Sequence, residues 1–167
     1  MELTKNEIRF VRQKSHKMNK STKWVIGHQI TPKETTGDYD LVIGETPAHV
    51  PGPPPHHHNN YSEVFLVVEG EMDFVINGEP RKVVTGESVD LPPGTIHTFG
   101  NNSDAPCKWV NIHSPKGFMQ FFEQMGVPIE EDKSFEKSID DELIQKVIQR
   151  ASDFDMVITM EAPHPSE

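Results

Sequence analysis

Turn residues interrupt residues 23–113 at intervals of roughly 6–12 residues, and this spacing constrains the fold more than any other feature. The chain of 167 residues contains 14 prolines and 11 glycines, and Asn77-Gly78 is typical of a tight hairpin. The segments between the turns are short and β-type: 23–30, 39–45, 63–68, 71–76, 81–84, 88–91, 96–99 and 106–113. The proline-rich segment 47–55 predicts a stiff loop. This pattern predicts an all-β sandwich or a small barrel.

The sequence changes character after residue 113. Ser114-Pro115 is typical of a helix start, and Gly126 of a helix end. Between them the apolar residues recur at helical spacing: Phe118, Phe121, Phe122 and Met125. A second helix is expected over 140–151, with a connector over 127–139. The predicted organisation is an N-terminal arm or edge strand (1–22), a β-barrel (23–113), a C-terminal helical extension (114–160) and a mobile tail (161–167).

Charge and cysteine content exclude several functional classes. The formal net charge is −10, which argues against nucleic acid or an anionic membrane surface as the main partner. Cys107 is the single cysteine, so no internal disulfide can form, and this fits the cytoplasm. No basic-then-apolar leader opens the chain, and no apolar segment approaches the ~20 residues of a membrane span. We therefore expect a cytoplasmic protein.

The segment 52–70, GPPPHHHNNYSEVFLVVEG, places three histidines directly after three prolines. His56 and His58 point to the same side of an extended strand, and the prolines restrict the backbone that presents them. Glu63 opens the next strand, and His97 follows a Pro-Gly turn. Three imidazoles and a carboxylate suit a divalent transition metal and leave coordination positions free for a substrate. The alternative is that adjacent histidines are only a surface feature.

The complete spacing resembles the two signature motifs of the cupin superfamily. The first motif is HxH, four residues, Glu63, six residues and Gly70. The second begins at Gly86 and continues through PxG to His97 and Asn101. This resemblance implies a small antiparallel β-barrel, a double-stranded β-helix or jelly roll, with a metal inside one mouth. It also implies that the metal ligands are His56, His58, Glu63 and His97, that Gly70, Gly86 and Gly94 are turn residues, and that Asn101 is structural.

Residues 24–160 have a narrower resemblance to the single-domain, quercetin 2,3-dioxygenase-like branch of cupins. It rests on GPPPHHH, on the Gly-Asn after HTF, and on SPKGFMQFFEQMG. Leu66 stands where this branch commonly has tyrosine. The resemblance implies a homodimer and one divalent metal per chain, with Fe, Mn, Ni, Co, Cu and Zn all compatible with the ligands.

The expected function is that of a metal-dependent dioxygenase acting with dioxygen on a small enolisable or phenolic substrate. Glu63 would be a metal ligand, or a general base that takes the substrate's hydroxyl proton. The candidate substrate wall, which ordinary barrel core would equally explain, is Phe65, Met72, Phe74 and Phe99. Further polar contacts are available from His113, Tyr61 and Trp24. Two alternatives remain open: a non-redox metalloenzyme such as an isomerase, lyase or cyclase, and a non-catalytic small-molecule-binding protein.

Overall fold

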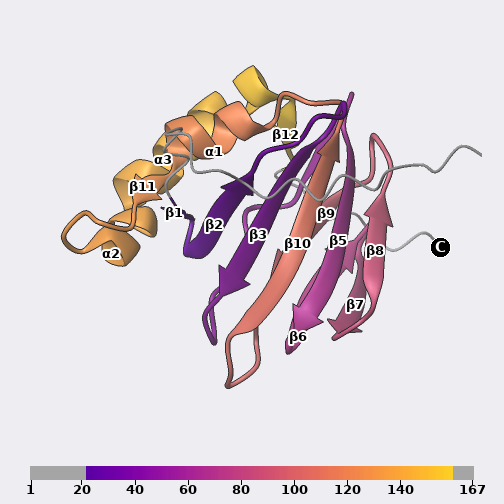
Figure 1. Cartoon of the computed structure of the whole chain (residues 1–167), viewed down its shortest axis with the longest axis horizontal. Coiled ribbons are helices and arrows are strands. Elements are labelled where there is room, and N and C mark those ends of the chain that lie inside the picture. Colours follow the sequence, from indigo (N-terminus) through magenta and orange to yellow (C-terminus); the bar gives the residue numbers. More distant parts are fainter. Residues whose placement is uncertain (1–21, 160–167) are drawn as a thin grey trace, which may run out of the picture.

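The computed structural model describes residues 22–159, which form two antiparallel β-sheets packed face to face (Figure 1). The strands of the first sheet are β1 (Lys23–Val25), β2 (His28–Lys33), β3 (Asp40–Thr46), β5 (Ser62–Glu69), β8 (Ser88–Leu91), β10 (Cys107–Ser114) and β11 (Val127–Pro128). Those of the second sheet are β4 (His56–His58), β6 (Glu71–Ile76), β7 (Glu79–Val84), β9 (His97–Gly100) and β12 (Met156–Ile158).

The strand orders are those of a jelly roll. The seven-stranded sheet has the order β11-β1-β2-β3-β10-β5-β8, and the five-stranded sheet has the order β12-β4-β9-β6-β7. The neighbouring strands β10 and β5 are far apart in the sequence, as are β4 and β9, so most of the sheet contacts are non-local. The predicted all-β barrel is therefore confirmed.

Side chains alternate between the interior and the surface along the central strands. On β10, Cys107, Trp109, Asn111 and His113 are buried, whereas the residues between them are more exposed. Three of these four residues are polar or carry a polar ring atom, which is unusual for the inner face of a small barrel. The interior is therefore built to hold polar chemistry as well as an apolar core.

The predicted strand 23–30 is wrong, because a tight turn divides it. Ile26 and Gly27 both have positive φ, and Val25 pairs with His28 across the turn that joins β1 to β2. A β-branched residue is strongly disfavoured in this conformation, so Ile26 concealed the turn that Gly27 indicated. The hairpin predicted at Asn77-Gly78 is confirmed, with Ile76 paired to Glu79.

Both predicted helices are present, but the first begins later than expected. Ser114 is the last residue of β10, where its hydroxyl donates to the carbonyl oxygen of Asp38. Helix α1 covers Met119–Met125 and ends at Gly126 as predicted. Helix α3 covers Asp141–Arg150, and the side chain of Asp140 caps it by accepting from the backbone N–H of Glu142. The helices lie together beside the β1–β2 side of the sandwich (Figure 1).

The expected connector 127–139 is not a simple loop. It contains β11, which pairs with β1, and a short helix α2 (Ser134–Ser138). After α3, a 3-10 helix η1 (Ala151–Phe154) leads into β12, which pairs with β4. The segment predicted as a helical extension thus also contributes one strand to each sheet.

Two of the predicted segments lie outside residues 22–159, which the structure describes. The N-terminal arm, apart from Thr22, and the tail lie outside the described residues. Within residues 22–159, no helix combines the length and the apolarity that crossing a membrane requires.

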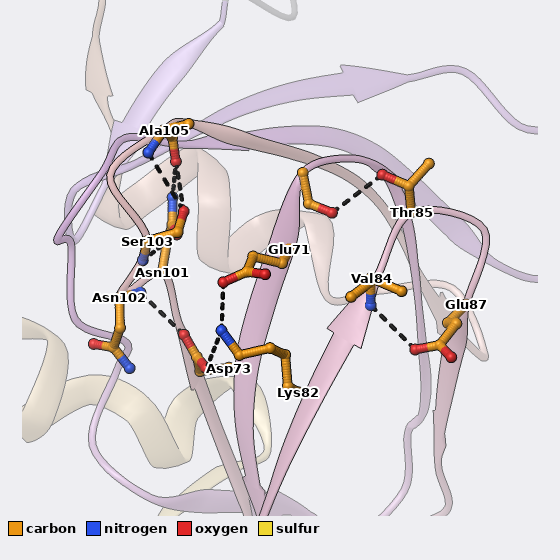
Figure 2. A network of polar contacts seen from close by, with 11 residues as sticks. Glu71, Asp73, Lys82, Val84, Thr85, Glu87, Asn101, Asn102, Ser103 and Ala105 are labelled. Carbon is orange, nitrogen blue, oxygen red and sulfur yellow. Dashed lines mark hydrogen bonds and ion pairs between the residues drawn. The ribbon is translucent and has the colours of Figure 1, made fainter.

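Asn101 holds the end of β9 in place, as its expected structural role requires. Its amide nitrogen donates to the carbonyl oxygens of Thr46, Pro47 and Ala105, and its Oδ1 accepts from the backbone N–H and the hydroxyl of Ser103. Figure 2 shows the part of this network formed by Asn101, Ser103 and Ala105, beside the Glu71–Lys82 ion pair. The asparagine therefore fixes the loop that connects β9 to β10.

Candidate metal centre

The structure brings His56, His58, Glu63 and His97 together inside the barrel. Their candidate ligand atoms all lie within 4.8 Å of one another, and none of the four residues is more than 4% exposed. The two histidines of β4 point inward from either side of His57, and His56 pairs directly with His97 on β9. Glu63 reaches the same point from β5 in the opposite sheet. The four residues predicted from spacing therefore form one buried cluster.

Local backbone carbonyls orient two of the imidazoles. His56 Nδ1 lies 3.0 Å from the carbonyl oxygen of Pro54, and His97 Nδ1 lies 3.0 Å from that of Thr95. A carbonyl oxygen can only accept, so each Nδ1 carries the hydrogen and each Nε2 presents a lone pair. Because each carbonyl lies two residues before its histidine, the stiff loop and the Pro-Gly turn set the tautomer as well as the direction.

The third imidazole is oriented from much further along the chain. His58 Nδ1 lies 2.9 Å from the carbonyl oxygen of Asp155, the residue immediately before β12. The side chain of Asp155 also accepts from the backbone N–H of Asn60. Asp155 has positive φ, which turns the chain between η1 and β12 and directs its carbonyl at the imidazole. This contact gives His58 the same tautomer as the other two histidines.

The arrangement leaves lone pairs facing one another. Glu63 Oε2 lies 2.9 Å from His97 Nε2 and 3.5 Å from His58 Nε2. All three atoms are buried and have no hydrogen-bond partner in the described part of the chain. While the imidazoles are neutral, these unpaired buried acceptors are costly and repel one another, and the raised pKa of His97 reflects a proton that relieves this repulsion when no cation is bound. A divalent cation coordinated by all of them removes both penalties, so the residues present fit such an ion.

The other carboxylate oxygen of Glu63 is held by residues of β10. Asn111 Nδ2 donates to Glu63 Oε1 over 2.8 Å, and His113 Nε2 lies 3.2 Å from the same oxygen. The ring of His113 stacks on Phe118, with centroids 4.0 Å apart. The two oxygens of Glu63 thus have different surroundings, since Oε1 is tethered and Oε2 faces the histidines.

Sequence reasoning missed Asn111 and left His113 unplaced. The detectable signal was the regular two-residue spacing of Trp109, Asn111 and His113 along a single strand, which puts all three side chains on the inner face. It passed unnoticed because no motif marks them.

Electrostatics favour a cation in the cluster. Burial opposes the ionisation of Glu63, but the imidazoles of His113 and His97 outweigh it and hold the pKa of Glu63 well below its usual value. Burial lowers the pKa of His97, but the Glu63 carboxylate more than offsets this effect and raises it. Burial, aided by His97, lowers the pKa of His56 to about 3. At physiological pH Glu63 is therefore ionised, and His56 is neutral and able to coordinate a metal ion.

Comparison with known proteins agrees with this fold. Residues 44–113 match the family model described as Cupin domain. This region is a cupin domain. It contains all four candidate ligands together with Asn111 and His113, whereas Asp155 and β12 lie outside it.

Several known proteins resemble parts of the chain. The HTH-type transcriptional regulator PuuR of Escherichia coli (strain K12) is 36% identical over 56 residues, which cover 34% of this chain and 30% of the regulator. The structure of KdgF from Halomonas sp. matches with a TM-score of 0.51 and 23% identity, over 55% of this chain and 81% of that one. A sugar phosphate isomerase from Silicibacter pomeroyi matches with a TM-score of 0.49 and 19% identity, over 53% of this chain and 59% of that one. The chain thus spans less than a third of the curated regulators that it matches.

The ligand cluster opens into a cavity inside the cupin domain. Its empty volume, including the open mouth, is about 470 Å³. Most of the lining is apolar and aromatic: Val25, Ile26, Ile30, Pro53, Phe65, Phe99, Trp109, Phe118, Phe121, Phe122 and Met156. The polar lining consists of His28, His56, His58, Glu63, Asn111 and His113. The cavity is therefore suited to a small, largely apolar or aromatic molecule.

The four residues proposed as substrate wall separate into two pairs. Phe65 and Phe99 line the cavity. Met72 and Phe74 do not, and this part of the prediction needs correction: both are fully buried on β6, and the Phe74 ring packs behind Phe65 at 5.2 Å. They belong to the core because the two lining rings separate them from the open space.

The remaining aromatic candidates also differ in position. Tyr61 lies beside the site, with its ring 5.9 Å from that of His58 and 5.6 Å from that of Phe118. Trp24 lies on β1 and packs edge-on against Phe135 of α2 at 5.0 Å, so it contacts the helical extension rather than the ligands.

Proposed function

We propose that the cupin domain holds one divalent transition metal through His56, His58, Glu63 and His97, and uses it to bind an oxygen donor of a small organic molecule. The observation that carries this proposal is the set of buried lone pairs on His58 Nε2, His97 Nε2 and Glu63 Oε2, which converge without partners in the described residues. When bound, such an ion supplies Lewis acidity that favours the ionised form of an enol or phenol.

We further propose that the reaction is the dioxygenation of an enolisable or phenolic substrate. Three features support it: the aromatic lining, the four-residue ligand set that leaves coordination positions free, and the division of roles within Glu63. Phe65 and Phe99 exclude water and offer flat faces to an aromatic substrate. Asn111 holds Oε1, so Oε2 would serve either as the metal ligand or, when not coordinated, as the base that accepts the substrate's hydroxyl proton.

A second candidate is a protein that binds a metabolite without converting it. The similarity to the transcriptional regulator PuuR favours it, since 56 residues of this chain are 36% identical to a protein named for regulation. On this alternative the same cavity and metal retain an unaltered small molecule. Product formation over hours separates the two candidates.

The first test is the metal content of untagged protein, measured by mass spectrometry. We expect about one divalent ion per chain in the wild type, and its loss in His56→Ala and in His97→Ala. His49→Ala is the matched control, because His49 is an exposed histidine that pairs with Asp104. No metal in the wild type, even after reconstitution, would overturn the metal proposal.

Oxygen consumption by the metal-loaded protein then tests the reaction. We expect uptake of dioxygen with simple phenols or diketones, and none in His97→Ala. Turnover that persists in anoxic buffer would replace the dioxygenase with a non-redox enzyme. Binding without any product would favour the second candidate.

We also propose a homodimer. The outer face of the seven-stranded sheet supports it, because Ile43, Val110 and Leu66 lie side by side on β3, β10 and β5, and Ile43 and Leu66 are exposed. Neighbouring exposed apolar side chains favour burial against a partner. Light scattering at micromolar concentration should give twice the chain mass, and a monomer would contradict the proposal.

A further inference from the structure

His28 is a buried histidine that lines the cavity but takes no part in the metal cluster. It is the first residue of β2, directly after the Ile26-Gly27 turn, and only 3% of it is exposed. Its ring packs against Phe99, with centroids 5.1 Å apart, and against Trp109 at 6.5 Å. It also lies outside the residues 44–113 that match the cupin family model.

One side of the His28 ring is fixed by hydrogen bonding. Nδ1 lies 2.9 Å from Thr46 Oγ1, and the same hydroxyl oxygen accepts from Trp109 Nε1 at 2.9 Å. Thr46 is fully buried, so this contact cannot be exchanged for bulk water. The imidazole is thereby held in one orientation before any ligand arrives.

The other ring nitrogen has no such partner. His28 Nε2 is buried and makes no hydrogen bond to any residue among 22–159. Leaving a buried polar atom unpaired is costly, so such an atom in a native site calls for a partner from outside the chain. Burial lowers the pKa of His28 to about 4, so the ring is neutral at physiological pH. The Pro51 carbonyl is close enough to the ring to raise this pKa slightly, but it makes no hydrogen bond of acceptable geometry with either ring nitrogen.

His28 differs from every other polar side chain in the described lining of the cavity. His56, His58 and Glu63 are candidate ligands, and Asn111 and His113 contact Glu63. His28 alone offers a free nitrogen that is committed neither to the metal nor to Glu63. Aromatic rings of Phe65, Phe99 and Trp109 line the same space.

We propose that His28 is a specificity-determining residue: its Nε2 hydrogen-bonds a second polar group of the ligand whose first oxygen the metal holds. This inference rests on the metal-held ligand of the proposed function and adds the ligand's chemical class. The ligand is a flat aromatic or enolic molecule with a metal-binding oxygen and, at a separate position, a hydroxyl or carbonyl group. A neutral imidazole nitrogen can donate to a carbonyl or accept from a hydroxyl, according to its tautomer.

The test uses zinc-loaded protein and two probes of nearly equal size. 4-Methylcatechol and 4-(hydroxymethyl)catechol share the metal-binding oxygens and differ only in the second polar group. Calorimetric titration of wild type should show that the hydroxymethyl compound binds about tenfold more tightly, the difference expected for one hydrogen bond. In His28→Phe both compounds should bind with the affinity of the methyl compound.

Two further measurements separate recognition from packing. His28→Gln keeps a polar atom near the position of Nε2 and should recover part of the preference. Nitrogen-15 spectra of labelled histidine should show the His28 Nε2 resonance moving with the hydroxymethyl compound and not with the methyl compound. Zinc stoichiometry must stay at the wild-type value in each variant, which shows that the cluster is intact.

The outcomes distinguish this inference from the function on which it rests. Equal affinity of both probes for wild type, or a preference retained in His28→Phe, would overturn the role of His28 alone. Failure of both probes to bind zinc-loaded wild type would overturn the metal-held ligand of the proposed function, and the role of His28 with it.

Discussion

His58 donates the hydrogen of its Nδ1 to the carbonyl oxygen of Asp155, which lies 97 residues further along the chain. The contact continues as a strand pairing, with Met156 opposite His58 and Ile158 opposite His56. The backbone N–H of Thr159 then donates to the carbonyl oxygen of Pro55. The strand that carries two candidate ligands is therefore held between β9 and a segment from the far side of the helices. Metal affinity and the order of residues 155–159 should depend on each other.

Removal of β12 should weaken metal binding. A chain that ends at Phe154 loses the carbonyl that orients His58, and we expect its zinc affinity to fall about 10–100-fold. A chain that ends at Thr159 is the matched control and should bind as the full chain does. Competition with a chromophoric chelator measures both, and equal affinities would contradict the link. In the full chain, zinc should also slow amide hydrogen exchange at residues 156–158.

Asn111→Ala should lower metal affinity without removing a ligand. The substitution frees Glu63 Oε1, which then competes with Oε2 or rotates away, and a loss of about tenfold or more is expected. Asn102→Ala is the control, because Asn102 is exposed and only its backbone contacts Asp73. A zinc titration that gives the same affinity for Asn111→Ala and wild type would show that Glu63 needs no tether.

Gly44→Ala should destabilise the barrel through Trp109. A Cβ at Gly44 would lie 2.3–2.4 Å from atoms of the indole ring, which is closer than any real contact. We expect a loss of about 1–3 kcal/mol in the free energy of unfolding, measured by urea denaturation. In a Trp109→Leu background the same substitution should cost less, because the ring is absent. A cost that is equal in both backgrounds would place the strain elsewhere.

His28 should make the stability of the metal-free protein sensitive to acid. Burial lowers its pKa from 6.5 to about 4, so between these values the unfolded chain binds the proton and the folded chain does not. The free energy of unfolding is therefore highest above pH 6.5, and it falls as the pH falls towards 4 because protonation favours the unfolded chain. At about 1.4 kcal/mol for each pKa unit, the loss is about 3 kcal/mol.

Denaturation curves at several pH values test this dependence. Between pH 6.5 and 4, the free energy of unfolding of His28→Phe should fall by about 3 kcal/mol less than that of wild type. His49→Ala, which removes an exposed imidazole, should follow wild type. Parallel curves for wild type and His28→Phe would show that His28 does not titrate as its burial requires.

The sequence predicted what depends on local spacing. The candidate ligands His56, His58, Glu63 and His97 were identifiable because each lies beside a turn or a proline segment that fixes its direction. The strands followed from the turn residues, except where Ile26 adopts a conformation that its residue type disfavours.

Features that depend on contacts between distant parts of the chain could not be predicted from the sequence. The three residues of β12 resemble many short apolar segments, and nothing local indicates that they pair with the histidines of β4. Ser114-Pro115 was misread as a helix start because its strand role depends on Asp38, 76 residues away. His28 gave no signal, since a single histidine in a strand is common and its surroundings come from three other strands.

The position of β12 in the chain also sets the order of events during synthesis. The last strand of the cupin domain ends near residue 113, and the ribosome must add about 45 further residues before Ile158 exists. At roughly 5–20 residues per second this takes on the order of 2–9 seconds. Throughout that interval His58 lacks the carbonyl that directs it, although the other ligand-bearing strands have been made. If the cluster binds a metal as proposed, its tight loading should therefore come at the end of biosynthesis, after the helices have brought the chain back to the barrel.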